Sequence, residues 1–272
     1  AYAGARLRSA AARLEESLAI CARRRLDREA LAQRSLRVHV HIYLGRLRGA
    51  LEDATAGAAQ ARADGAWRGE INLLLGVAAA AFSMGRLDHC AEAADAAAAR
   101  AAATGARRFD VVAALYLARL RLVAGDLAGA RALIERARDG AAATGAAVYG
   151  AQVEALAACA ADTPETAQDA LQAGERLLAA GAISHNALRF HPNAALVALR
   201  HGDAALALRA AQRLEAATAA EPIAWGRLHA AALRAATRGE ACAAGRIGRI
   251  AGRLGFAVLA ELCTGARPRV IA

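Results

Sequence analysis

The sequence predicts an all-α protein, an α-solenoid in which helix hairpins with a period of about 40 residues stack into a right-handed superhelix. Three observations predict it: an alanine-rich composition, helical spacing of the apolar residues, and glycines that recur at a fixed interval. Of the 272 residues, 57% are hydrophobic but only 4% are aromatic. Alanine has the highest helix propensity and buries little area per residue, so this composition favours closely packed helices over sheets.

The glycines define the repeat. Successive spacings of 40, 40, 77 and 37 residues separate Gly45, Gly85, Gly125, Gly202 and Gly239. The step of 77 corresponds to two repeats. A second series follows the first by about 20 residues, at Gly65, Gly105, Gly145 and Gly181. Glycine accepts the left-handed conformation that ends many helices, so two glycines per period indicate two helices per period.

Small residues occupy the fifth position after each glycine of the first series. They are Ala50, Cys90, Ala130, Ala207 and Ala244. A small side chain at this point permits close approach of the two helices of a hairpin. We therefore expect Cys90 to have a packing role in place of a chemical one.

The spacing of the glycines places the helices along the chain. The helix that begins near Gly4 is the second half of a hairpin, so the chain is expected to begin inside a longer array. Residues 183–200 form the first helix of the fifth hairpin, with Ser184 as its N-cap, and the next hairpin begins at Thr218. A closing helix pair covers residues 246–263, and the last nine residues are expected to fray. We expect about thirteen helices in one domain, residues 1–272.

Two resemblances follow from these residues. The small-residue and Gly-Asp pattern resembles tetratricopeptide (TPR) repeats, although the period is longer and the Trp, Tyr and Pro signature is absent. The segment "ISHN" with Leu188 and Phe190, then Gly202-Asp203, then "EP" with Trp225, is similar to the C-terminal helical region of bacterial multidomain adenylate/guanylate cyclases. In that family a class III cyclase domain and an AAA-type ATPase domain precede the array.

The resemblance implies that ATP binding and catalysis lie upstream, so no catalytic or cofactor-binding residue is assigned here. It marks six candidate interaction residues: Ser184, His185, Asn186, Arg189, Phe190 and Trp225. The structural alternatives are a helix cap with a hydrogen-bond network for the first three, and core packing for Trp225. This chain differs from the family over residues 189–193, where Pro192 removes a backbone donor and is expected to kink or restart the helix.

Other site types find little support in the sequence. Residues 245–255 lack the pattern of a phosphate-binding loop. His39 and His41 point to different sides of a helix, and His185, His191 and His201 have no carboxylate between them, so no metal site is predicted. Five scattered cysteines indicate no disulfide framework and favour a reducing cytoplasm.

Net charge and hydropathy limit the classes of partner that the sequence predicts. The net charge of +10 comes from arginine alone, and Arg246, Arg249 and Arg253 form a basic stripe that we interpret as a solvated face. Few aromatics accompany this stripe, which argues against nucleic acid. The longest apolar stretch, from Ile71, is too short to span a bilayer.

These observations predict a non-catalytic TPR-like module that acts as the protein-interaction or regulatory region of a cyclase/ATPase signalling protein. Its partner would be another protein or the upstream domains of the same chain. Two alternatives stay open. One is the helical sensor region of a LuxR/MalT-like ATPase transcription regulator, and the other is a stand-alone adaptor.

Overall fold

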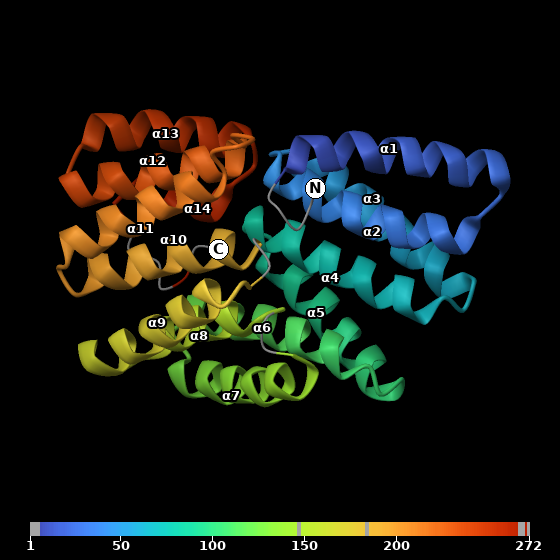
Figure 1. Ribbon diagram of the computed structural model, residues 1–272, viewed down its shortest axis with the longest axis horizontal. Helices are drawn as coiled ribbons and strands as arrows, with labels where there is room; N and C mark the ends of the chain where they lie inside the picture. Colours follow the sequence, from blue (N-terminus) through green and yellow to red (C-terminus); the bar gives the residue numbers. More distant parts are fainter. Residues whose placement is uncertain (1–5, 146–147, 183–184, 266–269, 271–272) are drawn as a thin grey trace.

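A computed structural model describes residues 6–145, 148–182, 185–265 and 270, and within them the chain is all-α (Figure 1). The described residues form fourteen helices and no strand. The helices are α1 (Leu7–Arg24), α2 (Asp27–Tyr43), α3 (Leu47–Ala63), α4 (Trp67–Ser83), α5 (Leu87–Ala103), α6 (Arg107–Val123), α7 (Leu127–Thr144), α8 (Gly150–Ala160), α9 (Pro164–Ala179), α10 (His185–Arg200), α11 (Ala204–Ala217), α12 (Ala224–Arg238), α13 (Ala241–Arg253) and α14 (Ala257–Leu262). The predicted α-solenoid is confirmed, with one helix more than expected.

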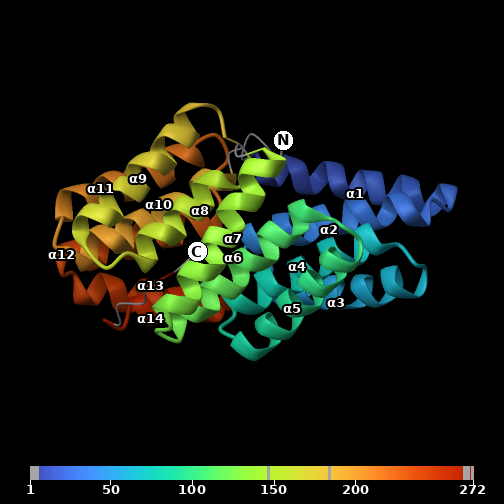
Figure 2. The same ribbon diagram turned by 90° about the horizontal axis from the view of Figure 1, so that it is seen from below.

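The helices form two layers. Each even-numbered helix contacts the helices before and after it in the chain and also the next even-numbered helix. Within the described part of the chain, successive odd-numbered helices do not contact one another. The even-numbered helices therefore form a continuous inner layer, and the odd-numbered helices form a spaced outer layer. Figure 1 shows the hairpins following one another around the molecule, and Figure 2 shows the same helices from below.

The glycines of the repeat adopt the conformation that the sequence predicts for them. Gly45, Gly85, Gly125, Gly202 and Gly239 have φ angles of 81°, 70°, 78°, 76° and 67°. At Gly45, which separates α2 from α3, the backbone is left-handed, and an L side chain would be strained there. The turn between helices is then only a few residues long, which keeps the two helices antiparallel.

The small residues five positions after these glycines differ in burial. Ala50, Cys90, Ala130 and Ala207 are completely buried, whereas Ala244 on α13 is only partly buried. Burial raises the pKa of the Cys90 thiol to about 12, so it stays protonated at neutral pH. This environment makes Cys90 a small packing residue.

The inner layer curves until its last helices meet its first. α12 contacts α2, and α14 contacts α4. Trp225 of α12 meets Tyr43 of α2 with ring centroids 5.4 Å apart and the planes nearly perpendicular, a favourable edge-to-face arrangement. Glu221, just before α12, accepts hydrogen bonds from the backbone N–H of Arg8 (2.8 Å) and of Ser9 (3.2 Å) at the start of α1. The array is therefore a closed ring of helices.

The structure differs from the sequence predictions at two places. α10 continues without interruption through Pro192, so the helix does not restart there. The neighbouring helices α8, α9, α11 and α12 pack against α10 and compensate for the one lost backbone hydrogen bond. Val270, in the segment expected to fray, is completely buried in the hydrophobic core.

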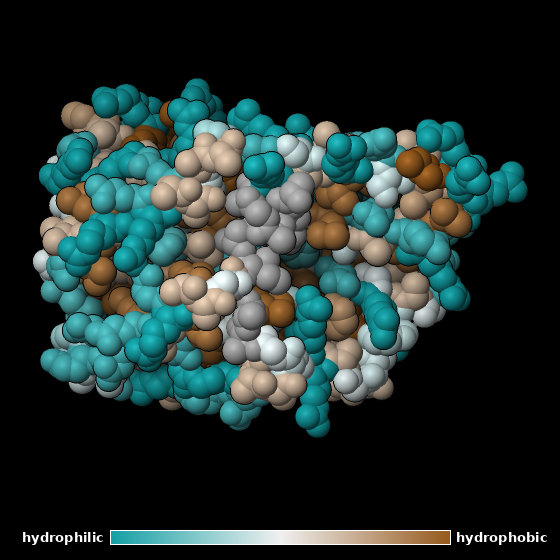
Figure 3. Space-filling view, in the orientation of Figure 1, coloured by the Kyte–Doolittle hydropathy of each residue, from teal (hydrophilic) through white to brown (hydrophobic). Residues whose placement is uncertain are grey.

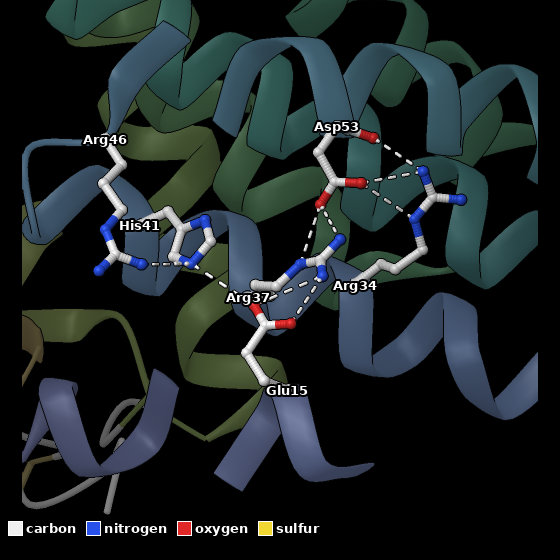
Figure 4. A network of polar contacts seen from close by, with 6 residues as sticks. All are labelled: Glu15, Arg34, Arg37, His41, Arg46 and Asp53. Atoms are coloured by element: carbon white, nitrogen blue, oxygen red, sulfur yellow. Dashed lines mark hydrogen bonds and ion pairs between the residues drawn. The ribbon is translucent and has the colours of Figure 1, made fainter. Parts of the chain in front are cut away.

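Charged side chains tie the outer layer to the inner one. Asp53 of α3 accepts hydrogen bonds from Arg34 (2.9 Å) and Arg37 (2.8 Å) of α2, and Arg37 reaches Glu15 of α1 at 3.2 Å (Figure 4). On the next hairpin, the buried carboxylate of Glu70 pairs with Arg62 at 2.7 Å and with Arg100 at 3.0 Å. Asp53 therefore joins α3 to α2, and Arg37 extends this contact to α1. Glu70 joins α4 to α3 and α5 directly.

One face of the molecule is rich in polar side chains. Figure 3 shows hydrophilic residues over most of one face, with small, scattered hydrophobic areas between them. Arg246, Arg249 and Arg253 of α13 are exposed, in agreement with a solvated face. None of the described helices is both long and apolar enough to cross a bilayer.

Candidate functional site

A cavity of about 430 Å³ lies against the inner layer, on the side where α6, α8 and α10 begin. We call it the central cavity. Its lining includes His39 and Tyr43 of α2, Tyr116 of α6, Gln152 of α8, and His185 and Arg189 of α10. Five of the inner helices contribute to it, because Asn72 and Leu75 of α4 also line it.

One position of the repeat contributes a residue from every one of these five helices. Ala32, Asn72, Val112, Gln152 and Arg189 all line the central cavity. The residue numbers differ by 40, 40, 40 and 37, which is the same spacing as that of the repeat glycines. The cavity therefore follows from the repeat itself, and only the side chains at this position change from one hairpin to the next.

The floor of the central cavity is cationic and aromatic. Arg189 is 4% exposed, and its Nε donates a hydrogen bond to the Tyr43 hydroxyl at 3.0 Å. Its guanidinium carbon lies 5.3 Å from the centre of the Tyr43 ring and 5.9 Å from that of Trp225. Such contacts with ring faces help to hold a buried guanidinium charge.

A second buried arginine lies behind this floor. The guanidinium of Arg119 lies 5.1 Å from the centre of the Tyr116 ring, and Tyr116 lines the cavity. Burial, and then the positive charge of Arg189, lower the pKa of Arg119 to about 10. Arg119 therefore stays charged at neutral pH, and two cations lie near the floor.

The two cavity histidines are neutral at neutral pH. Burial is the main cause that lowers the pKa of His185 to about 4, and the neighbouring titratable groups of His39, Arg189 and Arg108 lower it further. Burial also lowers the pKa of His39, whose Nδ1 lies 2.8 Å from the carbonyl oxygen of Ser35. Since a carbonyl only accepts, Nδ1 carries the proton, and Nε2 of the neutral ring is left as an acceptor.

The mouth of the central cavity is more exposed and also aromatic. Arg108, in the first turn of α6, is exposed, and its guanidinium carbon lies 6.0 Å from the centre of the Tyr149 ring. Tyr149 and Phe109 are half-buried, and Tyr149 lies 6.1 Å from the His185 ring between centroids. Because α6, α8 and α10 all begin here, the positive ends of their dipoles point toward this mouth.

The structure separates the six sequence-predicted residues. His185 and Arg189 line the central cavity, and Asn186 is buried beside it, where its Nδ2 donates to the Val148 carbonyl at 3.0 Å. Trp225 is a core residue, stacked on His229 with centroids 3.9 Å apart. Phe190 points away from the cavity, toward Gly174 of α9. Ser184 lies outside the described residues.

Sequence reasoning missed the tyrosines. Tyr43, Tyr116 and Tyr149 come from three different hairpins and belong to no local motif. The signal that could have found the cavity is the repeat register, because stepping back from Arg189 by 37 and then by 40 residues reaches Gln152, Val112, Asn72 and Ala32. That step requires knowledge of which face of each helix is the inner one.

The arrangement suits binding more than bond chemistry. The cavity presents guanidinium, hydroxyl, amide and neutral imidazole groups in a half-open space. Among the described residues, no group of three or more His, Cys, Asp or Glu side chains is placed to hold a metal ion. His39 and His41 face different partners, the cavity and Glu15 of α1. Neither a known protein family nor a curated protein matches the chain.

Proposed function

We propose that this chain is a non-catalytic, TPR-like regulatory and protein-interaction module of a cyclase/ATPase signalling protein that works in the cytoplasm. The sequence resemblance to the C-terminal arrays of multidomain cyclases suggests that the activity under control is that of a nucleotide cyclase domain. The closed ring supplies a means of control, because a partner that changes one hairpin changes its fit with the others.

One observation supports this proposal more than any other. α10, which carries the family-motif residues, places His185 and Arg189 in a cavity shared by five inner helices. The same Arg189 contacts Tyr43 of α2, and Tyr43 contacts Trp225 of α12. A shift of α10 would therefore change the packing of α2 in the first hairpin and of α12 near the end of the array. This is expected of a module that transmits a signal.

The experiment begins with the reading frame upstream of the codon for Ala1. We expect it to encode a cyclase domain and a phosphate-binding loop. The nucleotide cyclase rate of the full protein is then compared with that of a form that lacks residues 1–272. A change of several-fold in the rate is expected. An upstream frame without these domains, or an unchanged rate, would contradict the proposal.

The same reading frame separates the two alternatives. A helix-turn-helix after Ala272 together with an upstream ATPase domain would favour the transcription regulator. A start codon directly before Ala1 would favour an independent adaptor.

A further inference from the structure

The turn from α1 into α2 departs from the repeat, and we call residues 20–28 the α1–α2 tip. The second glycine series, which includes Gly65 and Gly105, extends backward by 40 residues to position 25, where the chain has arginine. Arg25 has a φ of 55°, and it is the one described residue other than glycine with a positive φ. A left-handed backbone strains an L side chain, whereas glycine adopts it freely. Arginine is therefore less favourable here than the glycine of the repeat, which indicates a role other than stability.

The α1–α2 tip gathers positive charge. Residues 23–26 read RRRL, whereas residues 63–66 read ADGA and residues 103–106 read ATGA. With Arg28, four arginines lie within six residues, and all four are exposed. None of them pairs with a carboxylate in the part of the chain that the structure describes. The acidic residues of the tip and of the first turn of α2 are Asp27 and Glu29, so four arginines against two carboxylates leave an excess of two positive charges.

The α1–α2 tip also exposes large apolar side chains. Ile20 is 43% exposed and Leu26 is 39% exposed, and they are two of the six large apolar side chains that are exposed among the described residues. Ile20 precedes Arg23 and Arg24 by about one helical turn, so it lies on the same side of α1 as these arginines. The residue one repeat after Ile20 is the polar Gln60. The tip therefore combines cations with aliphatic side chains where the next hairpin combines neither.

The location of the α1–α2 tip leaves it accessible. Figure 1 shows that α1 starts near the middle of the molecule and that its turn into α2 lies at the right-hand end. Figure 3 shows hydrophilic residues projecting at this end, with hydrophobic areas next to them. A broad surface could therefore approach the tip before it meets the rest of the molecule.

These properties fit the surface of an anionic membrane. Arginines near such a surface are attracted to the lipid phosphates, and neighbouring aliphatic side chains gain by entering the boundary of the acyl chains. A nucleic acid would use the arginines but would leave Ile20 and Leu26 in water. Nucleic-acid sites also use aromatic side chains for stacking, and the α1–α2 tip has none.

We propose that the α1–α2 tip docks this chain on an anionic membrane surface, with its four arginines at the lipid phosphates and with Ile20 and Leu26 in the interface. The contact is peripheral, so it needs no helix that crosses the bilayer. It places the proposed regulatory module at a membrane surface and does not depend on the cyclase output.

Vesicle flotation with the chain of residues 1–272 tests the proposal. Vesicles of phosphatidylcholine alone are compared with vesicles that also contain about 30% phosphatidylglycerol, in about 0.1 M salt. We expect binding to the anionic vesicles to be at least tenfold tighter than binding to the neutral ones.

Paired substitutions localise the contact. Arg23→Gln with Arg24→Gln should weaken binding to the anionic vesicles at least tenfold. Arg246→Gln with Arg249→Gln, on the exposed face of α13, makes the same change in net charge and is the control, which should weaken binding by less than threefold. Far-UV circular dichroism checks that each variant folds.

A second pair tests the apolar part of the contact. Ile20→Ser with Leu26→Ser keeps every charge and should still weaken binding at least threefold, because the aliphatic side chains no longer enter the interface.

Arg25→Gly restores the residue of the repeat and separates binding from stability. Its midpoint of urea unfolding should rise, because the strain at position 25 is relieved. Its binding to anionic vesicles should weaken at least threefold, because one cation is lost. A lower midpoint would show that Arg25 serves the turn itself, and would contradict the proposal.

Four further results would overturn the proposal. They are equal binding to neutral and anionic vesicles, equal losses in the two arginine pairs, unchanged binding after the two serine substitutions, and tighter binding to a short DNA duplex than to the anionic vesicles. None of them bears on the cyclase assay, so the two proposals fail separately.

Discussion

Buried histidines couple the stability of this protein to pH. His229 is 2% exposed, its Nδ1 lies 2.8 Å from the Trp225 carbonyl oxygen, and its ring stacks on Trp225. Burial lowers the pKa of His229 to about 3 and those of His185 and His191 to about 4. The folded chain therefore holds these three rings neutral at any pH above about 5.

This arrangement predicts acid sensitivity. An unfolded histidine titrates near 6.5, whereas the folded rings do not take up a proton until about pH 4 or below. Their contribution to stability is fully present above pH 6.5 and is lost as the pH falls toward the folded values. Each ring should lower the free energy of unfolding by about 1 kcal/mol per pH unit in this window.

Urea unfolding between pH 7 and pH 5 measures the effect. His229→Gln should reduce the slope of the free energy of unfolding against pH by about the contribution of one proton. It also lowers the free energy of unfolding at pH 7. His201→Gln, at an exposed position, is the control for the loss of one imidazole. An identical slope in parent and His229→Gln would mean that His229 is not held neutral in the fold.

At the scale of the element, helix contacts depend on where glycine permits close approach. A Cβ at Gly174 of α9 would clash with the ring of Phe190 on α10. A Cβ at Gly49 of α3 would meet no atom within 4 Å, and this residue is exposed. Both glycines are inside helices, where alanine is intrinsically favoured by about 1 kcal/mol.

The two positions therefore predict opposite outcomes. Gly49→Ala should raise the free energy of unfolding by up to about 1 kcal/mol, because it gains helix propensity without a steric cost. Gly174→Ala should lower it by about 1–3 kcal/mol, because overpacking against Phe190 outweighs the same gain. Chemical denaturation of both variants measures the difference, and stabilisation by Gly174→Ala would show that α9 and α10 are not packed as described.

Much of the element level could be predicted from the sequence. The glycines at Gly45, Gly85 and Gly125 marked the turns, since glycine is the residue that best accepts a positive φ. Pro192 misled the prediction, because local propensity ignores the helices that pack around α10. The central cavity was missed for a related reason: in alanine-rich helices the inner and outer faces have similar composition, so the sequence does not show which side faces the ring.

At the scale of the whole molecule, closure of the ring distinguishes this protein from an open solenoid. It depends on small rotations that accumulate over all the hairpins, which no local sequence pattern encodes. The contact between Arg189 and Tyr43 joins residues 146 positions apart. The central cavity and the proposed transmission between hairpins both depend on this closure.

The contact between Glu221 and the start of α1 offers the most direct test of closure. Glu221 accepts hydrogen bonds from the backbone of Arg8 and Ser9 and from the Ser9 hydroxyl. The chain contains no lysine, so Ser9→Lys introduces a single side-chain amine. A carbodiimide then joins this amine to a carboxylate in contact with it, without a spacer, and mass spectrometry identifies the linked peptides.

A closed ring predicts that the amine at position 9 is joined to Glu221, and that the product disappears when Glu221→Gln is added. Crosslinks only to acidic residues of α1 itself, such as Glu15 or Glu16, would contradict closure. In that case the last helices would not meet the first, the helices would not form a closed ring, and the central cavity would not exist in the form described.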